Sequence, residues 1–418
     1  MIAGLGVFVL LIAGAGWFFD ALVINLYAVS VPKIEESLHA STTTIGLIAT
    51  IFLVGYAGGT FAGGLMSDYI GRKKGLGISI LGYTVTTALT GLASSPAMLG
   101  IARALTGLGG GMELPVATTY LAETWPEKSR GRGFGMFYSF YSLGSLAAVG
   151  FFGLFLNVAE GWRYAFLLCL LPGLLIVFVR QFLVETPRFQ TVQQRFAGEK
   201  RKTTIRQLFA GKSSRRALIG TTIAWIGTEY TYWSYSVYLP LYLMQKGHLS
   251  PGRMTGAMAL IYLLAIVFVV GSGWLGDRLG RRNATILTAV AGAVAMYFFT
   301  SRRVDSLPLL IVLGFLVFGI YQGPWVNGIL YCGESFPTEM RGTATSFSLT
   351  VGRVGALFAP LVAGILIKYY SIPVAFRLGS LMFLLSIAGV LIAGEPKRQL
   401  ADFCEEQAGG GAVVAQSS

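Results

Sequence analysis

Long apolar stretches dominate the chain, and they restrict its possible folds more than any other feature. A helix that crosses about 30 Å of hydrocarbon needs about 20 mainly apolar residues. Twelve such stretches follow one another: 5–29, 44–66, 75–93, 97–121, 134–157, 162–183, 217–243, 254–276, 283–300, 307–331, 344–368 and 373–394. Only 12% of the 418 residues are charged, against about 25% in a typical soluble protein. We therefore expect an all-α membrane protein with twelve transmembrane helices.

Residues that bind metals or react with substrates are scarce. The chain has two histidines and three cysteines, and none of them is spaced as in a metal site. A nucleophile paired with a base is also not visible. We therefore expect no metal, no cofactor and no enzymatic activity. The net charge of +13 falls in loops too short to form a nucleic-acid-binding domain, so we expect no nucleic-acid partner.

Basic residues are concentrated in every second loop. If the N-terminus is cytoplasmic, 21 of the 32 Lys and Arg residues lie on that side, nine of them in 184–216. By the positive-inside rule, both termini are then cytoplasmic in a multi-pass protein of the cell membrane. The expected parts are an N-terminal bundle (1–183), a basic cytoplasmic linker (184–216) with a surface helix near 203–209, a C-terminal bundle (217–394) and a disordered tail (395–418).

The two halves of the chain carry the same motifs. A loop of the form G-x-x-x-D-x-x-G-R at 64–72 returns 209 residues later at 273–281, and E-x-x-P-x-x-x-R-G at 123–131 returns at 334–342. A Glu-Pro pair after the sixth stretch, at 185–187, is matched at 395–396 after the twelfth. Two pseudo-symmetric six-helix bundles are therefore expected, and transporters with alternating access rock such halves about a central site.

The duplicated loop resembles the signature of the major facilitator superfamily between spans 2 and 3 and between spans 8 and 9. The sequence Arg103-x-x-x-Gly107-x-Gly109-x-Gly111 resembles the motif of its fourth span. One departure is Tyr69, where the family usually has Arg or Lys. The resemblance implies ion pairs between helices that hold the cytoplasmic gate shut, and the alternative is that these charges only set topology. The candidate gating residues are Gly64, Asp68, Arg72, Glu123, Arg130, Glu185, Arg188, Gly273, Asp277, Arg281, Glu334, Arg341 and Glu395.

Charged residues inside apolar spans are costly and usually functional. Asp20 in the first span and Arg103 in the fourth lie at depths close enough to pair, and Glu113 lies further along the fourth span. The segment 17–24 resembles the first-span element of proton-coupled sugar porters. That resemblance implies that Asp20 carries the proton and Arg103 modulates it, with Glu113 as a further candidate for proton coupling. A static structural ion pair is the alternative for Asp20.

The expected substrate-binding residues lie in spans 7, 10 and 11. The sequence Gly352-Arg353-Val-Gly355 resembles the organic-anion branch of the family, which includes organic anion transporters and nicotinate-type permeases. The resemblance implies that Arg353 binds the negative charge of the substrate; the alternative is that it pairs with Glu113 or Glu229. Aromatic and amide groups can line a cavity or form interfacial belts. The remaining candidates are Glu229, Tyr230, Tyr232, Trp233, Gln322, Trp325 and Asn327.

These observations predict a secondary transporter that imports a small organic anion together with protons. Its expected partners are the substrate, protons and the lipid bilayer, and we expect a monomer. The glutamine-rich motifs of sugar porters in spans 5 and 7 are missing, so a sugar or polyol symporter is the second interpretation. A transporter-like receptor that binds solute without moving it is the interpretation from another class.

Overall fold

The fold was analysed in a computed structural model that describes residues 2–155, 157–195, 208–209, 211–301, 307–336 and 341–394. Within these ranges the regular structure is helical, without a strand. The first half contains α1 (Ile2–Leu38), α2 (Thr42–Ile70), α3 (Arg72–Gly91), α4 (Pro96–Thr124), the short η1 (Glu127–Ser129), α5 (Arg130–Gly153), α6 (Gly161–Leu168) and α7 (Leu170–Arg180). After α8 (Pro187–Arg195), the second half contains α10 (Lys212–Ser236), α11 (Leu239–Gly247), α12 (Pro251–Leu279), α13 (Arg281–Ser301), α14 (Leu307–Glu334), α15 (Arg341–Tyr369), α16 (Ile372–Leu381) and α17 (Phe383–Ala393).

The twelve expected spans are confirmed by these helices. Nine spans are single helices, while the sixth (α6–α7), seventh (α10–α11) and twelfth (α16–α17) each consist of two consecutive helices. By length and apolar composition alone, nine spans in the described part of the chain are long enough to cross a membrane. The other three, 75–93, 97–121 and 217–243, are richer in Gly, Thr and Tyr. These residues lower the mean hydropathy of the three spans, which the structure nevertheless shows as helices.

The duplicated loop motif reverses the chain at equivalent points of the two halves. Gly71 separates α2 from α3 with φ +99°, and Gly280 separates α12 from α13 with φ +82°. Positive φ values are readily adopted by glycine because it lacks a Cβ atom. The two glycines are 209 residues apart. The repeat seen in the sequence is therefore also a repeat of backbone conformation.

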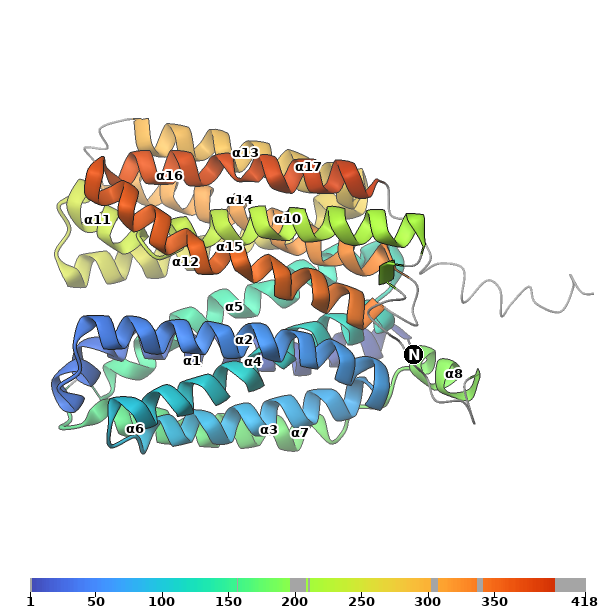
Figure 1. Cartoon of the computed structure of the whole chain (residues 1–418), viewed down its shortest axis with the longest axis horizontal. Helices are drawn as coiled ribbons and strands as arrows, with labels where there is room; N and C mark the ends of the chain where they lie inside the picture. The colour runs from blue at the N-terminus through green and yellow to red at the C-terminus, as the bar shows by residue number, and fades with distance from the viewer. Residues whose placement is uncertain are drawn as a thin grey trace, which may run out of the picture.

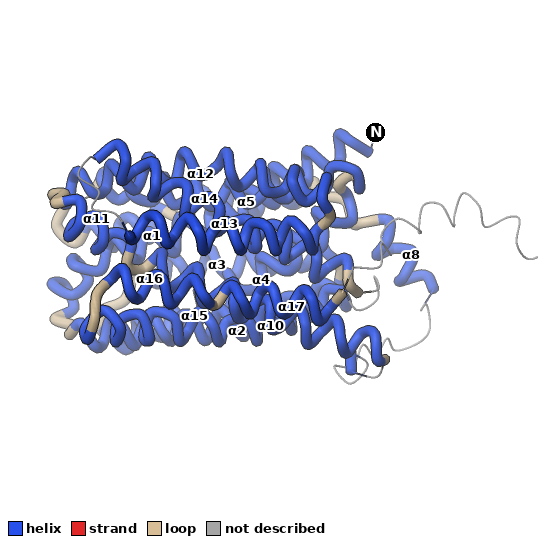
Figure 2. The backbone as a smooth tube through the Cα atoms, turned by 90° about the horizontal axis from the view of Figure 1, so that it is seen from above, coloured by secondary structure: helices blue, strands red, loops and turns tan. Residues whose placement is uncertain are grey.

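Two helical bundles lie side by side, α1–α7 in one and α10–α17 in the other (Figure 1). Figure 2 shows the long helices running roughly along one common axis. Within the first bundle α2 packs tightly on α4, and a Cβ added at Gly111 would lie 2.0 Å from the carbonyl oxygen of Tyr56. Across the bundles the main contacts join α5 to α12 and α2 to α15. The expected two six-helix bundles are thus confirmed.

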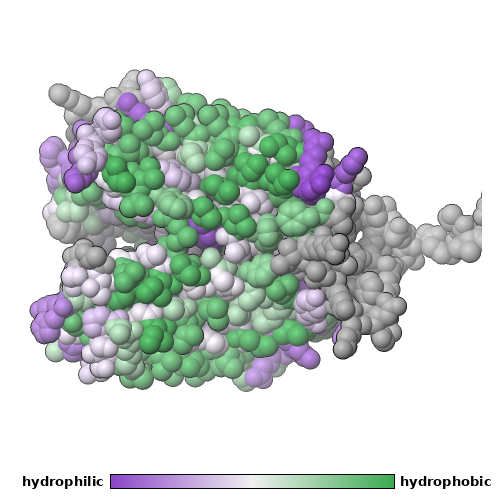
Figure 3. Space-filling view, in the orientation of Figure 1, coloured by the Kyte–Doolittle hydropathy of each residue, from purple (hydrophilic) through white to green (hydrophobic). Residues whose placement is uncertain are grey.

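The surface matches a protein that lies in a membrane. Figure 3 shows an apolar body with hydrophilic residues gathered at its two ends. Large apolar side chains point outward from this body, for example Leu171, Val267 and Leu384, which are 63%, 71% and 63% exposed. In water such exposure would be costly, whereas lipid tails solvate it. Figure 3 also shows an indentation between the halves at the end opposite α8.

The segment between the bundles begins with α8 at residues 187–195, a helix that the sequence analysis did not anticipate. The helix expected near 203–209 lies largely outside the described residues; of that stretch only Leu208 and Phe209 are described, and both are helical. The tail 395–418 also lies outside them. The boundaries assigned to linker and tail therefore remain predictions.

Candidate functional site

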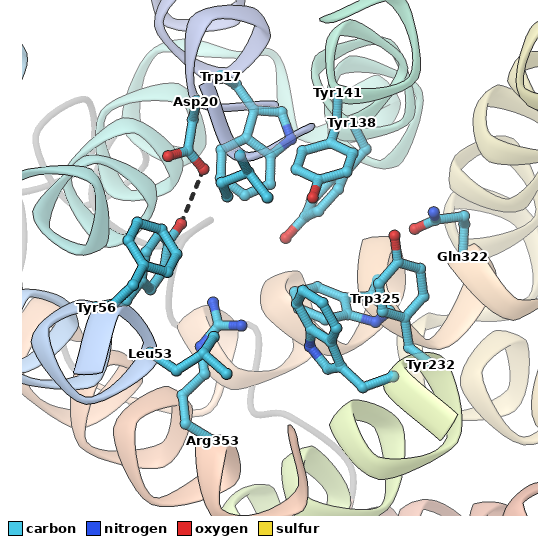
Figure 4. Close-up of a pocket in the computed structure, with 13 residues that line it drawn as sticks. Trp17, Asp20, Leu53, Tyr56, Tyr138, Tyr141, Tyr232, Gln322, Trp325 and Arg353 are labelled. Atoms are coloured by element: carbon cyan, nitrogen blue, oxygen red, sulfur yellow. Dashed lines mark hydrogen bonds between the residues drawn. The ribbon is translucent and has the colours of Figure 1, made fainter. Parts of the chain in front are cut away.

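A central cavity lies between the two bundles. The space between its walls, together with the adjoining open solvent, amounts to about 500 Å³. Most of the lining is aromatic, and the charged groups that reach it are Asp20 and Arg353 (Figure 4). The lining residues are Trp17, Asp20, Ile24, Phe52, Leu53, Tyr56, Tyr138, Tyr141, Tyr232, Trp233, Gln322, Trp325 and Arg353. Five of the expected site residues on spans 7, 10 and 11 therefore share this cavity with Asp20.

Asp20 is completely buried on α1 and meets the cavity through its carboxylate. The phenol of Tyr56 on α2 donates a hydrogen bond of 3.0 Å to its Oδ2, shown as the dashed line in Figure 4. The phenol of Tyr83 on α3 donates to the backbone carbonyl of Asp20 at 3.3 Å. A buried carboxylate with a neutral partner carries an uncompensated charge when it is ionised. This position is therefore suited to binding a proton.

Arg353 on α15 is paired with Glu229 on α10. Its Nη1 lies 3.0 Å from Oε1 of Glu229 and donates to Oε2 at 3.2 Å. The indole of Trp233 donates a further hydrogen bond of 3.0 Å to the same Oε2. Of the two alternatives considered for Arg353, the protein partner Glu229 is thus present in this structure. Glu229 is behind Arg353 rather than in the cavity wall.

The guanidinium of Arg353 nevertheless remains directed into the cavity. Figure 4 shows it between the rings of Tyr56 and Trp325, whose centroids lie 4.7 and 5.8 Å from its Cζ. Its Nε makes no hydrogen bond, although the side chain is only 5% exposed. A planar guanidinium binds a carboxylate through two parallel hydrogen bonds. Arg353 therefore keeps donor capacity toward the cavity.

The expected pair between Asp20 and Arg103 is not formed in this structure. Arg103 is held between two aromatic rings, with its Cζ 4.4 Å from the centroid of Tyr27 and 4.2 Å from that of Phe52. Its Nε and Nη1 make no hydrogen bond. Depth along a helix follows from the 1.5 Å rise per residue, but that rise does not fix which neighbour the side chain meets. Cation–π contact replaces the ion pair here.

Glu113 also has a different partner from those expected. Its Oε2 accepts hydrogen bonds of 2.8 Å from Nη1 of Arg180 on α7 and from Oγ of Ser79 on α3. Both side chains of the Arg180–Glu113 pair are buried. Gly16 on α1 crosses directly over the pair, because a Cβ at that position would collide with both. Arg180 was missed because it ends an apolar stretch, where basic residues usually mark topology.

Besides Glu229, two more of the expected substrate-binding residues do not line the cavity. Asn327 is buried and donates to the carbonyls of Ser272 and Gly323 at 3.0 and 3.1 Å, which ties α14 to α12. Tyr230 lies outside the lining set as well. Conversely, Tyr56, Tyr138 and Tyr141 line the cavity although no sequence motif pointed to them. Tyr138 and Tyr141 had one signal in the sequence, because their three-residue spacing places both on one helical face.

The candidate gating residues meet at the α8 end of the molecule, where two aspartates bind helix N-termini of the opposite half. Asp68 on α2 accepts from the backbone N–H and the hydroxyl of Thr343 on α15, both at 2.8 Å. Asp277 on α12 accepts from the N–H groups of Gly131 and Arg132 on α5, at 2.7 and 3.0 Å. Helix N-termini stabilise negative charge. The two halves are therefore joined here by a pair of pseudo-symmetric contacts.

The charged groups around these aspartates form networks mostly within each half. Arg72 donates to both oxygens of Glu123 at 2.7 and 3.2 Å, and Glu185 accepts from the N–H of Arg72 at 3.0 Å. In the other half Arg281 pairs with Asp277 at 2.9 Å and with Glu334 at 3.5 Å. Among the described residues, ion pairs that cross between the halves include Arg130–Glu334 and Arg132–Asp277, both at 3.5 Å.

The remaining candidate gating residues are mainly structural in their contacts. Arg341 donates to the carbonyls of Gly333 and Phe336 at 2.7 and 3.2 Å. Gly64 and Gly273 allow close crossing of the halves, because an added Cβ would meet Ser346 at 1.8 Å and Gly131 at 2.0 Å, respectively. The side chain of Arg188 and all of Glu395 lie outside the described residues.

Comparisons with known proteins agree with this architecture. A family model described as Major Facilitator Superfamily matches residues 7–353 and, in an overlapping match, 248–408. The structure of the proton:xylose symporter XylE superposes with a TM-score of 0.77 at 18% identity, covering 92% of this chain and 94% of that chain. At this identity the superposition shows the fold alone.

Relatives in sequence cover almost the whole chain. A putative niacin/nicotinamide transporter of Bacillus subtilis is 28% identical over 93% of this chain and 96% of its own length. A cis,cis-muconate transport protein of Acinetobacter baylyi is 29% identical (90% and 91%), and a gallate transporter of Pseudomonas putida is 27% identical (91% and 89%). These matches confirm the family expected from the duplicated loops, and they support transport rather than enzymatic activity. The chain belongs to the major facilitator superfamily.

Proposed function

We propose that this transporter moves a small organic anion across the cell membrane together with protons. The substrate is a carboxylate attached to a flat ring or a conjugated chain, and it occupies the central cavity. The observation that carries the proposal is the position of Arg353, a buried cation facing a cavity whose walls are mostly aromatic. Arginine pairs with carboxylates in two parallel bonds, and aromatic side chains pack on flat rings in stacked or edge-on geometry.

The named relatives support the same class of substrate. Niacin, cis,cis-muconate and gallate appear in the names of three of them and share a carboxyl group beside a ring or a conjugated chain. The Bacillus subtilis relative is named for both niacin and the neutral nicotinamide, so the charge of the substrate must be tested directly. Asp20 is proposed to bind and release the proton, because it is a buried acid that reaches the same cavity. Both termini are proposed to be cytoplasmic, with the charges at the α8 end forming the inner gate of a monomer.

Transport by purified protein in liposomes tests this proposal. Under an inward proton gradient, nicotinate and cis,cis-muconate should accumulate, while nicotinamide, which has nearly the same shape but lacks the charge, should not. Accumulation of xylose or another sugar in place of the acids would support the sugar alternative. Binding of the acid without any flux would support a receptor.

Arg353→Lys separates the role of charge from that of geometry. Lysine keeps the positive charge beside Glu229 but loses the planar fork, so nicotinate binding should weaken about 10- to 150-fold, as expected for a lost charged hydrogen bond. Binding of nicotinamide serves as the control and should change little. Undiminished nicotinate affinity in an Arg353→Ala protein would contradict the proposed anion site.

A further inference from the structure

The internal repeat relates the two buried acids at the centre of the molecule. Glu229 follows Asp20 by 209 residues, the same interval that separates the duplicated loops. Each acid lies on the first helix of its half, and each is completely buried. Asp20 reaches the cavity directly, whereas Glu229 stands behind two cavity-lining residues, Arg353 and Trp233. The two carboxylates are therefore equivalent in the repeat but differ in their surroundings.

The cation beside Glu229 has no counterpart at the equivalent position of the first half. The residue that precedes Arg353 by 209 positions is Gly144, where a side chain would collide with the carbonyl oxygen of Phe18 on α1. Asp20 consequently has the phenol of Tyr56 as its partner, while Glu229 has a guanidinium. The same guanidinium lies 4.7 Å from the ring of Tyr56. A continuous row of polar groups thus joins the two acids across the halves.

We propose that Glu229 competes with the substrate carboxylate for Arg353 and that a proton on Glu229 decides the competition. A proton from the water phase joins a carboxylate oxygen of Glu229, and the ion pair with Arg353 opens. The N–H groups of Arg353 then donate to the carboxylate of the substrate. No other bond is made or broken, and the proton returns to water when the substrate leaves. This inference rests on the proposed function and names the residue that links substrate binding to protonation.

Charge balance in a buried site is the physical reason for the competition. The Arg353–Glu229 pair is neutral as a unit, so an incoming carboxylate would leave one uncompensated negative charge away from water. Such a charge is strongly disfavoured in a protein interior and within a membrane. One added proton removes it. Trp233 continues to donate to Oε2 of Glu229 in either protonation state.

Among the groups near Glu229, Arg353 is the one whose positive charge compensates its negative charge. The phenols of Tyr138 and Tyr141 approach from α5 across the cavity, and Tyr232 lies on the same helix as Glu229. On the other helices packed against α10, Ser386 of α17 bonds to Thr228 and Arg377 of α16 bonds to Thr300, while Gln322 of α14 is a neutral residue of the cavity wall. Removing the charge of Glu229 should therefore act mainly through Arg353.

The decisive measurement is the pH dependence of nicotinate binding to the purified full-length protein. In the wild type the dissociation constant should rise by up to about tenfold per pH unit as Glu229 loses its proton, the slope for one linked proton. Glu229→Gln resembles the protonated acid, so it should bind nicotinate tightly with little dependence on pH. Glu36→Gln, at an exposed acid that is not part of the cavity lining, is the matched control and should behave as the wild type.

A second measurement does not depend on the folding of a variant. When wild-type protein binds nicotinate in weak buffer, a pH-sensitive dye should report proton uptake, and Glu229→Gln should take up about one proton fewer. If Glu229→Gln is unstable because Arg353 has lost its partner, Glu229→Gln/Arg353→Gln should restore folding while nicotinate binding stays weak. A wild-type pH dependence retained by Glu229→Gln, or binding without proton uptake, would overturn the inference while leaving carboxylate transport intact. Failure of the wild type to bind any carboxylate would overturn the proposed function as well.

Discussion

At the scale of single residues, Asp20 offers a direct test of the proposed proton coupling. It is an acid buried in a mainly apolar cavity, with a neutral hydrogen-bond partner. Asp20→Asn keeps the shape of the side chain but cannot bind a proton, so accumulation driven by a pH gradient should be lost. Exchange of internal for external substrate requires no net proton movement and should persist. Uphill uptake and counterflow in the same liposome preparation measure the two activities separately.

The neighbouring phenol provides a control for this substitution. Tyr56→Phe removes the hydrogen bond to Asp20 but leaves the acid in place, so proton-driven accumulation should continue. If Asp20→Asn accumulates substrate as well as the wild type does, Asp20 is not the proton carrier. Glu229 would then be left as the acid proposed to couple transport to protons.

Residue chemistry was easier to predict from the sequence than residue partners. A charge within an apolar span is conspicuous, and two such residues, Asp20 and Arg353, both reach the cavity. The same reasoning paired Asp20 with Arg103 by depth, whereas Arg103 lies between Tyr27 and Phe52. Which face of a helix meets which neighbour depends on packing across the bundle. That information is not contained in any one span.

At the scale of elements, the contact between Asp277 and the first turn of α5 explains how one half holds a helix of the other. Asp277→Asn removes the negative charge and one of the two acceptor oxygens that serve Gly131 and Arg132. We expect the closed state at the α8 end to lose about 1–2 kcal/mol, which raises the open population about 5- to 30-fold. The open state lacks this contact and is not destabilised by the substitution, so its population rises.

Cysteine labelling from the α8 side measures this shift. Ser272→Cys is a conservative reporter, buried on α12 beside the crossing with α5, and it is used after Cys169, Cys332 and Cys404 have been replaced by serine. Labelling should be faster in the Asp277→Asn protein. Glu127→Gln removes an exposed acid at the same end and should have no effect. Equal labelling rates in all three proteins would mean that Asp277 only sets topology.

The elements themselves followed from the sequence more completely than their contacts did. Apolar length identified all twelve spans, and the glycines of the duplicated loop marked two of the sharpest reversals. The breaks that divide spans 6, 7 and 12 into two helices each were not anticipated. They fall at Cys169, at 237–238 and at Met382, inside spans that hydropathy identifies only as continuous apolar stretches.

At the scale of the whole molecule, the two halves are joined at the α8 end through two separate seams. One is the α5–α12 seam closed by Asp277, and the other is the α2–α15 seam closed by Asp68. The internal repeat makes these contacts equivalent, with each half providing one acid and one helix N-terminus. If each half moves as a rigid body, both seams must open together. If the helices bend independently, each seam can open alone.

A pair of reporters distinguishes these two motions. Ser346→Cys lies on α15 beside Gly64 in the Asp68 seam, and Ser272→Cys lies in the Asp277 seam. For rigid halves, either Asp68→Asn or Asp277→Asn should increase labelling at both reporters by similar factors. In the double variant those factors should multiply, because distant contacts that stabilise one closed state contribute additively to its free energy. A response confined to the reporter in the substituted seam would rule out rigid rocking and would indicate that helices open one side at a time.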